Sequence, residues 1–357
     1  MELEFRTCAV YDTKQSADSV EWCPHPEGEA LFVCGTYQLE SNDQSTGGSD
    51  RKGRVFLFRF HDIDTGERHP DDDDNRSLTV LQTLERSAVL DQKWNPSQCD
   101  RLAVAGSDGT IHVYALADIE TPRLESQVMR SLLDEESPVL ALSLDWSREG
   151  GRMVVSDSGG TVNLLSFDSE LKIINRWKAH SFEAWTAAFS RHNENVVYSG
   201  GDDSLLCIHD LRCPGVPVSK NKSHTAGVTS LLSFEHREHI LLTGSYDGKV
   251  RLFDERQMKA DVTQVDLVGG IWRLRPNPRC PDQILCACMY ENFSTIQLTA
   301  DLGLVKTGAY DAHDSICYGC DWQVVSPNRS PTNDTYVATC SFYDHKLCVS
   351  KVVSLYR

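Results

Sequence analysis

The sequence predicts an all-β propeller of seven blades in one domain, and two observations carry this prediction. The first is an internal repeat, in which His180 and Asp210 recur forty-four positions later as His224 and Asp254. The second is that short stretches of alternating polarity, divided by polar turns, follow one another along the chain. A single sheet of this kind leaves a face unburied, whereas a closed ring buries each sheet against its neighbours.

The repeated unit has the features of a WD repeat. The text SGGDDSLLCIHD recurs as TGSYDGKVRLFD, with a histidine early in each unit, an acid before a tight turn and a closing aromatic–Asp pair. We expect the histidine and the turn acid to hydrogen-bond across the top of a blade. Structural roles are therefore assigned to His180, Asp203, His224, Asp247 and Asp344.

Seven segments carry strand and turn signals, and each is interpreted as one blade. They span about residues 18–60, 88–117, 138–168, 180–212, 224–256, 270–298 and 316–352. The seventh segment lacks a regular outer strand. We expect residues 4–11, which alternate in polarity, to supply that strand and close the ring, which removes an exposed sheet edge.

The composition limits the classes of partner. The chain has 52 acidic and 35 basic residues, a formal charge of -17, and phosphate binding needs a basic face, so nucleic acid is not expected. No apolar run is long enough to span a bilayer, and the first residues do not form a secretory leader. The 13 cysteines show no disulfide framework, which predicts reduced thiols and a cytoplasmic protein.

Aligning the segments on their turns reveals a recurrent aromatic position. The residue before the turn acid is tyrosine in four of the seven segments. A second position, four residues before the aromatic residue of the inner strand, holds Asp18, Leu90, Leu142, Trp185, Ser230, Trp272 and Tyr318. If both positions approach one rim, the aromatic residues gather there. Filling of blade interfaces is the alternative explanation.

Polar residues near this rim are the candidates for chemistry. Glu183 lies just before Trp185, and His345 stands where a WD turn normally has glycine. Histidine titrates near neutrality and could act as a general base. A third group, Glu21, Asp145 and Asp321, would line the central channel, where the acids could bind a cation or water.

No metal or cofactor is expected. His236 and His239 form an isolated pair, which is too few ligands for zinc. Cys34 and Cys340 are interpreted as small buried residues in the position that Ser199 holds in the repeat. No G-x-S-x-G nucleophile elbow or phosphate-cradling loop occurs in the sequence.

Several phrases are more specific than the general repeat. They include ADSVEWCP at 17–24, CGTYQL at 34–39, AHSFEAW at 179–185 and ATCSFYDH at 338–345. Through these phrases the chain resembles, from residue 17 to residue 345, the WD-repeat diphthine methyl ester hydrolases of the diphthamide pathway. The resemblance implies a carboxylic ester hydrolase that acts on elongation factor 2. Its substrate would be methylated diphthine, a modified histidine, and its products diphthine and methanol, before the final amidation to diphthamide.

The resemblance brings no catalytic residues, so their roles are assigned from this sequence. The substrate carries a trimethylammonium group, which aromatic faces bind with about 0.5–2 kcal/mol for each cation–π contact. Arg273 would polarise the ester carbonyl, and His345 or Glu183 would activate a water molecule. The predicted cage is drawn from Tyr37, Trp185, Tyr246, Trp272 and Tyr343.

Two other functions use the same surface. Most WD propellers bind partners without catalysis, and a fold does not establish a function, so a scaffold is one alternative. A reader of methylated cationic side chains is the second, since it would need the aromatic cage and no hydrolysis.

Overall fold

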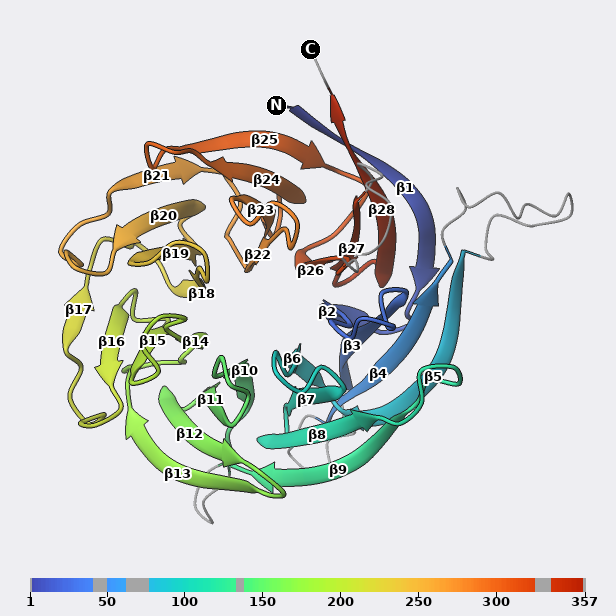
Figure 1. Ribbon diagram of the computed structural model, residues 1–357, viewed down its shortest axis with the longest axis horizontal. Helices are drawn as coiled ribbons and strands as arrows, with labels where there is room; N and C mark the ends of the chain where they lie inside the picture. The colour runs from blue at the N-terminus through green and yellow to red at the C-terminus, as the bar shows by residue number, and fades with distance from the viewer. Residues whose placement is uncertain (1, 41–49, 62–76, 133–137, 325–334, 356–357) are drawn as a thin grey trace, which may run out of the picture.

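Seven antiparallel sheets of four strands stand in a ring in the computed structural model (Figure 1). The strands nearest the axis are β2, β6, β10, β14, β18, β22 and β26. The structure describes residues 2–40, 50–61, 77–132, 138–324 and 335–355. The described part of the chain has no helix that is both long and apolar enough to cross a membrane. The predicted seven-bladed propeller is therefore confirmed.

The first three blades are continuous in sequence. Blade 1 consists of β2 (Ser16–Trp22), β3 (Leu31–Glu40), β4 (Asp50–Phe60) and β5 (Leu78–Ser87). Blade 2 consists of β6 (Val89–Trp94), β7 (Arg101–Gly106), β8 (Thr110–Leu116) and β9 (Leu124–Ser131). Blade 3 consists of β10 (Ala141–Trp146), β11 (Arg152–Asp157), β12 (Thr161–Phe167) and β13 (Leu171–Lys178).

The next three blades follow the same order. Blade 4 consists of β14 (Thr186–Phe189), β15 (Val196–Gly200), β16 (Leu206–Asp210) and β17 (Ser219–Asn221). Blade 5 consists of β18 (Val228–Ser233), β19 (Ile240–Ser245), β20 (Lys249–Asp254) and β21 (Thr263–Asp266). Blade 6 consists of β22 (Arg273–Pro276), β23 (Gln283–Ala287), β24 (Phe293–Leu298) and β25 (Leu304–Tyr310).

Blade 7 joins the two ends of the chain. Its first three strands are β26 (Cys317–Trp322), β27 (Thr335–Ser341) and β28 (Lys346–Leu355), and its outer strand is β1 (Glu2–Asp12). β1 pairs with β28 from Glu2↔Leu355 to Asp12↔Lys346, and the two strands lie side by side in Figure 1. The N-terminal strand therefore closes the ring as predicted.

The outer strands extend beyond the segments expected from the sequence. In blades 1 to 6 the expected segments contain the three inner strands, and the fourth strand begins after each segment ends. β9 shows the reason, since most of its residues are exposed or half-buried and its hydrophobic pattern is weak. The outermost strand of a blade pairs with only one other strand and buries few side chains, so its sequence needs few apolar residues.

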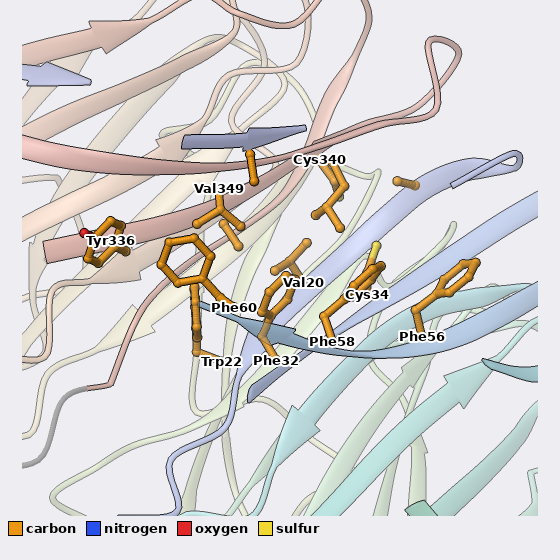
Figure 2. Close-up of a cluster of buried hydrophobic side chains, with 14 residues drawn as sticks. Val20, Trp22, Phe32, Cys34, Phe56, Phe58, Phe60, Tyr336, Cys340 and Val349 are labelled. Atoms are coloured by element: carbon orange, nitrogen blue, oxygen red, sulfur yellow. The ribbon is translucent and has the colours of Figure 1, made fainter. Parts of the chain in front are cut away.

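The cores lie between blades. Each of the seven buried hydrophobic clusters in the described chain draws residues from two neighbouring sheets. In the cluster between blades 7 and 1, the rings of Trp22 and Phe32 are 4.7 Å apart and those of Phe60 and Tyr336 are 5.0 Å apart (Figure 2). Aromatic packing of this kind joins the blade that contains both chain ends to the blade that follows it.

The repeat histidine binds a hydroxyl in three blades. His180 Nε2 lies 2.9 Å from Ser199 Oγ, and the corresponding bond from His224 to Thr243 is 2.8 Å. Blade 7 has the same bond, of 2.9 Å, between His313 Nε2 and Thr339 Oγ1. Thr339, not its neighbour Cys340, therefore occupies the hydroxyl position. Cys340 is buried as expected, but it does not hold the hydroxyl position, because the turn after Thr339 is one residue longer than in the two repeated units.

The expected bond between histidine and turn acid forms in only one of the two repeated units. His180 Nδ1 lies 2.8 Å from Asp203 Oδ1. In blade 5 Asp247 instead forms an ion pair of 2.8 Å with Arg251, and His224 Nδ1 has no hydrogen-bond partner among the described residues. Arginine thus replaces histidine as the partner of that acid.

Candidate functional site

The upper rim of the propeller is formed where inner strands begin and second strands end. Antiparallel pairing puts these two points together: Thr186, at the start of β14, faces Gly200, and Val228, at the start of β18, faces Ser245. Trp185 directly precedes β14, and Tyr246 directly follows β19. The two aromatic positions found in the sequence therefore lie at the same edge of the sheets.

Seven aromatic side chains form a continuous series along this rim, which we call the aromatic band. Consecutive ring centroids are 4.8–5.9 Å apart, and the series runs through blades 5, 4, 6, 7 and 1. Its members are Tyr246, Trp185, Trp272, Tyr318, Phe342, Tyr343 and Tyr37. The five residues of the predicted cage all belong to it, together with Phe342, which the sequence analysis missed although it lies in the phrase ATCSFYDH.

Polar contacts fix the ends of the band. Trp185 Nε1 donates a hydrogen bond of 3.0 Å to Asp202, and Arg51 Nε donates one of 2.9 Å to the hydroxyl of Tyr37. Burial raises the pKa of Tyr246 and Tyr318, so these phenols remain neutral. The band therefore presents uncharged π faces, which suit a cation that has no hydrogen to donate.

Asp18 lies near enough to two members of the band, Tyr318 and Tyr246, to affect them electrostatically. It is on β2, its side chain belongs to a residue only 4% exposed, and its Oδ1 has no hydrogen-bond partner among the described residues. Burial raises its pKa to about 7, with Asp91 adding to the rise and Arg273 opposing it. Its negative charge in turn raises the pKa of Tyr318 and, more weakly, of Tyr246. A buried carboxyl with a pKa in this range is a common feature of functional sites.

Asp18 carried no obvious signal in the sequence. It holds in blade 1 the position that Trp185, Trp272 and Tyr318 hold in theirs. Asp18 is the one acid in this series, in which aromatic residues are the recurrent feature. The informative signal would have been a carboxylate at a blade position whose counterparts in neighbouring blades are aromatic.

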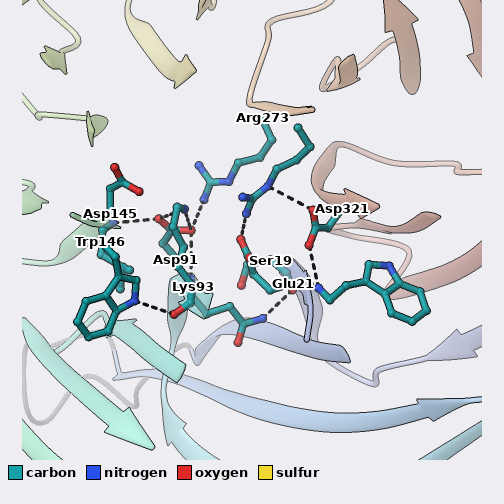
Figure 3. A network of polar contacts seen from close by, with 12 residues as sticks. Ser19, Glu21, Asp91, Lys93, Asp145, Trp146, Arg273 and Asp321 are labelled. Carbon is teal, nitrogen blue, oxygen red and sulfur yellow. Dashed lines mark hydrogen bonds and ion pairs between the residues drawn. The ribbon is translucent and has the colours of Figure 1, made fainter. Parts of the chain in front are cut away.

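Arg273 lies at the start of β22 and points into the channel (Figure 3). Its Nη2 is 3.3 Å from Asp91 Oδ1 and 3.2 Å from the carbonyl oxygen of Leu90, and its guanidinium is 5.6 Å from the ring centroid of Trp272. Arg273 is also among the residues that line a cavity of about 570 Å³ inside the channel. The predicted carbonyl-polarising residue therefore stands between the band and the channel.

The channel acids are paired with basic side chains and bind neighbouring blades (Figure 3). Asp145 pairs with Arg191 at 2.8 Å, and Glu21 and Asp321 both pair with Arg275. Asp145 also accepts the backbone N–H of Phe189 on blade 4, and Asp321 accepts that of Trp22 on blade 1. Within the described residues no group of three or more His, Cys, Asp or Glu side chains is arranged to hold a metal ion.

Glu183 and His345 lie in different places. Glu183 is half-buried next to Trp185, and its carbonyl oxygen accepts the N–H of Asp202 at 2.9 Å. His345 has a φ of 56°, as expected at a glycine position, and its carbonyl oxygen accepts the N–H of Thr13 beyond the end of β1. In the described part of the chain, the side chain of neither residue forms a hydrogen bond or ion pair with Arg273 or with a member of the band.

Comparison with known proteins agrees with the fold. Residues 215–254 match the family model "WD domain, G-beta repeat". A chain in "Crystal Structure of Mitotic Checkpoint Complex" superposes with a TM-score of 0.69 at 17% identity, over 98% of this chain and 92% of that one. The ring and its repeats thus define a WD-repeat propeller.

Relatives that span most of the chain define the family. "Diphthine methyltransferase" of Mus musculus is 36% identical over 92% of this chain and 71% of its own length, and that of Homo sapiens is 37% identical over 87% and 73%. The Schizosaccharomyces pombe protein of the same name is 32% identical over 94% of this chain and 96% of its own length. The chain belongs to the diphthine methyltransferase family.

Proposed function

We propose that the protein hydrolyses the methyl ester of methylated diphthine on elongation factor 2. The observation that carries this proposal is the aromatic band, which lies beside a buried arginine and a buried carboxyl. The names of the relatives tie the family to diphthine, and the resemblance described above implies ester hydrolysis. The charge of -17 favours approach of a cationic substrate segment.

The band would recognise the trimethylammonium group. A quaternary ammonium offers no hydrogen-bond donor, so its binding depends on aromatic faces and nearby negative charge. Trp272 is central to this arrangement, because its ring lies 5.7 Å from Trp185, 5.9 Å from Tyr246 and 4.8 Å from Tyr318. A cation seated here would bring the ester within reach of Arg273, which adjoins Trp272 in sequence.

The reaction adds one water molecule to the ester and releases a carboxylate, methanol and a proton. Arg273 would stabilise the negative charge that develops on the carbonyl oxygen. Direct attack by water is favoured over an acyl-enzyme because the cysteines near the site make poor nucleophiles: burial raises the pKa of Cys340 and Cys317 well above that of an ordinary thiol. His345 and Glu183 are the residues that the sequence offers for activating the water.

The same proposal places the reaction in the cytoplasm. None of the thirteen cysteines, all of which lie in the described residues, forms a disulfide. Absence of disulfides is typical of proteins from reducing compartments.

The test is mass spectrometry of elongation factor 2 carrying methylated diphthine, after incubation with the purified protein. We expect conversion of the methyl ester to a carboxylate, with release of methanol. Trp272→Ala should lower kcat/KM by at least about tenfold through the loss of cation–π contacts, whereas Trp272→Phe keeps an aromatic face and should retain most activity. His345→Ala and Glu183→Gln show whether either residue is needed.

Other outcomes separate the alternatives. Binding of the substrate protein without any change in its mass would indicate a scaffold or a reader. Binding that also disappears when the trimethylammonium group is absent would favour the reader. Gain of a methyl group in the presence of a methyl donor would instead support transfer, as the name of the relatives states.

A further inference from the structure

We propose that Asp18 is the general base of the site, the carboxylate that removes a proton from the attacking water while Arg273 stabilises the oxyanion. This inference rests on the proposed hydrolysis and names the residue that performs its proton transfer. It assigns to Asp18 the task that the sequence analysis gave to His345 or Glu183.

Burial without a partner is the first reason. Leaving a polar atom unpaired in the interior costs about 1–3 kcal/mol, and folded proteins rarely tolerate it without cause. Asp18 Oδ1 is in this state, in a residue that is 4% exposed. This oxygen keeps its capacity to accept a proton but is closed off from solvent, so a water molecule reaches it only when the side chains around it, Tyr318 among them, move aside.

Close approach of two strands sets the position of Asp18. A Cβ atom at Gly319 would lie 2.8 Å from the backbone nitrogen of Val20 and 2.9 Å from the carbonyl carbon of Ser19. Only glycine therefore lets β26 pack this closely on β2. The approach brings Tyr318, the residue before Gly319, toward Asp18, the residue before Ser19.

Asp91 provides the contrast that separates the two roles. The positive charge of Arg273 acts on both carboxyl groups, but Asp91 also forms an ion pair of 3.0 Å with Lys93 and accepts the N–H of Leu144 at 2.9 Å. Burial alone would raise the pKa of Asp91, and these partners outweigh it, so the pKa is lowered. Two neighbouring carboxyl groups with oppositely shifted pKa values are typical of an acid–base site. In this pair Asp91 remains ionised and Asp18 exchanges the proton.

The charged and titratable groups that face Asp18 come from five strands or turns. They are Arg273 on β22, Asp91 on β6, Tyr246 after β19, Tyr318 on β26 and Cys340 on β27. Only Arg273 among them carries a positive charge. Burial and Asp91 together outweigh it, which raises the pKa of Asp18 to about 7, close to the value at which a general base works best at neutral pH.

The proton path closes with Asp18 restored. The carboxylate takes one proton from water, and the water oxygen bonds to the ester carbon to give a tetrahedral intermediate whose oxyanion faces Arg273. The intermediate then breaks its bond to the methoxy oxygen, which receives the proton from Asp18 and leaves as methanol. The product acid loses its own proton to solvent, so the reaction consumes one water and regenerates the carboxylate.

The experiment compares the pH dependence of ester hydrolysis in the wild type and in Asp18→Asn. We expect kcat/KM of the wild type to rise with pH through a midpoint near 7, where Asp18 loses its proton. Asp18→Asn should lose at least about 100-fold in kcat and the rising limb with it, while binding of the methylated substrate is retained. Asp314→Asn, which changes an exposed acid at the same rim, is the matched control.

A second variant tests the role without depending on the first. Asp18→Ala should be rescued by added formate, which can enter the space left by the side chain and accept the proton; a merely structural role would give no such rescue. Full activity and an unchanged pH profile in Asp18→Asn would overturn the inference while leaving the proposed function intact. Absence of hydrolysis by the wild type would overturn both.

Discussion

Histidine at the rim has two environments, and they predict opposite sensitivities. His180 is 2% exposed and occupies both ring nitrogens with Ser199 and Asp203. His345 is half-buried, and the side chain forms no hydrogen bond within the described residues. The first is therefore part of the structure of blade 4, and the second is held chiefly through its backbone.

Replacing the buried histidine should destabilise the protein. His180→Ala removes the hydrogen bonds from the imidazole to Ser199 and Asp203 and leaves space where the ring was, and we expect the free energy of unfolding to fall by about 1–3 kcal/mol. Denaturation in urea, followed by fluorescence, measures the change. His345→Ala serves as the control and should have the smaller effect; an equal loss in both variants would contradict this account of the repeat.

The pKa of Asp18 predicts how stability depends on pH. The group titrates at about 7 in the folded protein and near 3.8 when unfolded, so its contribution is present below pH 4 and lost as pH rises through 7. Asparagine does not ionise, so Asp18→Asn does not lose this stability as the pH rises. Its unfolding free energy relative to the wild type should therefore increase from pH 5 to pH 8, by about 2.6 kcal/mol at 1.36 kcal/mol for each pH unit between 5 and 7.

This difference is measured by thermal and urea denaturation of both proteins at the two pH values. Neither method depends on enzymatic activity. A difference that stays constant with pH would show that Asp18 is ionised throughout the range. That result would also weaken its assignment as a base that works near neutrality.

The sequence was enough to bring together most of the aromatic residues of the band, but not the polar residues of the proposed site. Tyrosine and tryptophan recur at fixed positions of each repeat, so aligning the repeats was enough to find them. Asp18 and Arg273 are 255 positions apart in sequence, and nothing local relates them. His313 was missed for another reason: it lies 26 residues before its hydroxyl partner, whereas the other two units have 19.

Among the elements, the inner strands are linked by more than hydrophobic packing. Asp91, Asp145 and Asp321 each accept a backbone N–H from the inner strand of the next blade. A carboxylate that accepts such a bond and also pairs with a basic side chain fixes the distance between two blades. Two of the three acids that the sequence suggested as a cation site, Asp145 and Asp321, form such links, and the third, Glu21, pairs with Arg275.

The outermost strand of blade 7 predicts the effect of a truncation. β1 forms hydrogen bonds along β28, and it also contacts blade 6, where Thr7 Oγ1 lies 2.8 Å from the hydroxyl of Tyr310 and the ring of Phe5 stacks on it at 5.2 Å. Deleting residues 1–12 would expose an edge of β28 and open the cores that Leu3 and Ala9 help to fill.

We expect the truncated chain to lose cooperative unfolding and to aggregate, which circular dichroism and size-exclusion chromatography would detect. Deletion of residues 356–357 at the other end is the control and should leave the unfolding transition unchanged. A truncated protein with the wild-type transition would mean that the ring is held without its closing strand.

At the scale of the whole molecule, the site exists only in the closed ring. The aromatic band takes residues from five of the seven blades, and Asp18 and Arg273 come from two blades that blade 7 separates. No single repeat contains the proposed site, which explains why repeat patterns predict the fold from sequence, whereas a candidate site appears only once the blades are assembled. Blades 2 and 3 contribute no ring to the band.

The pairing of β1 with β28 also imposes an order on biosynthesis. During translation β1 leaves the ribosome more than 330 residues before its partner β28, so throughout that interval the strand has no sheet to join. The last sheet, and with it the band and its buried acid, can form only once that partner has emerged. An arrest late in translation would therefore yield a chain with six sheets encoded, an unpaired first strand and no functional site.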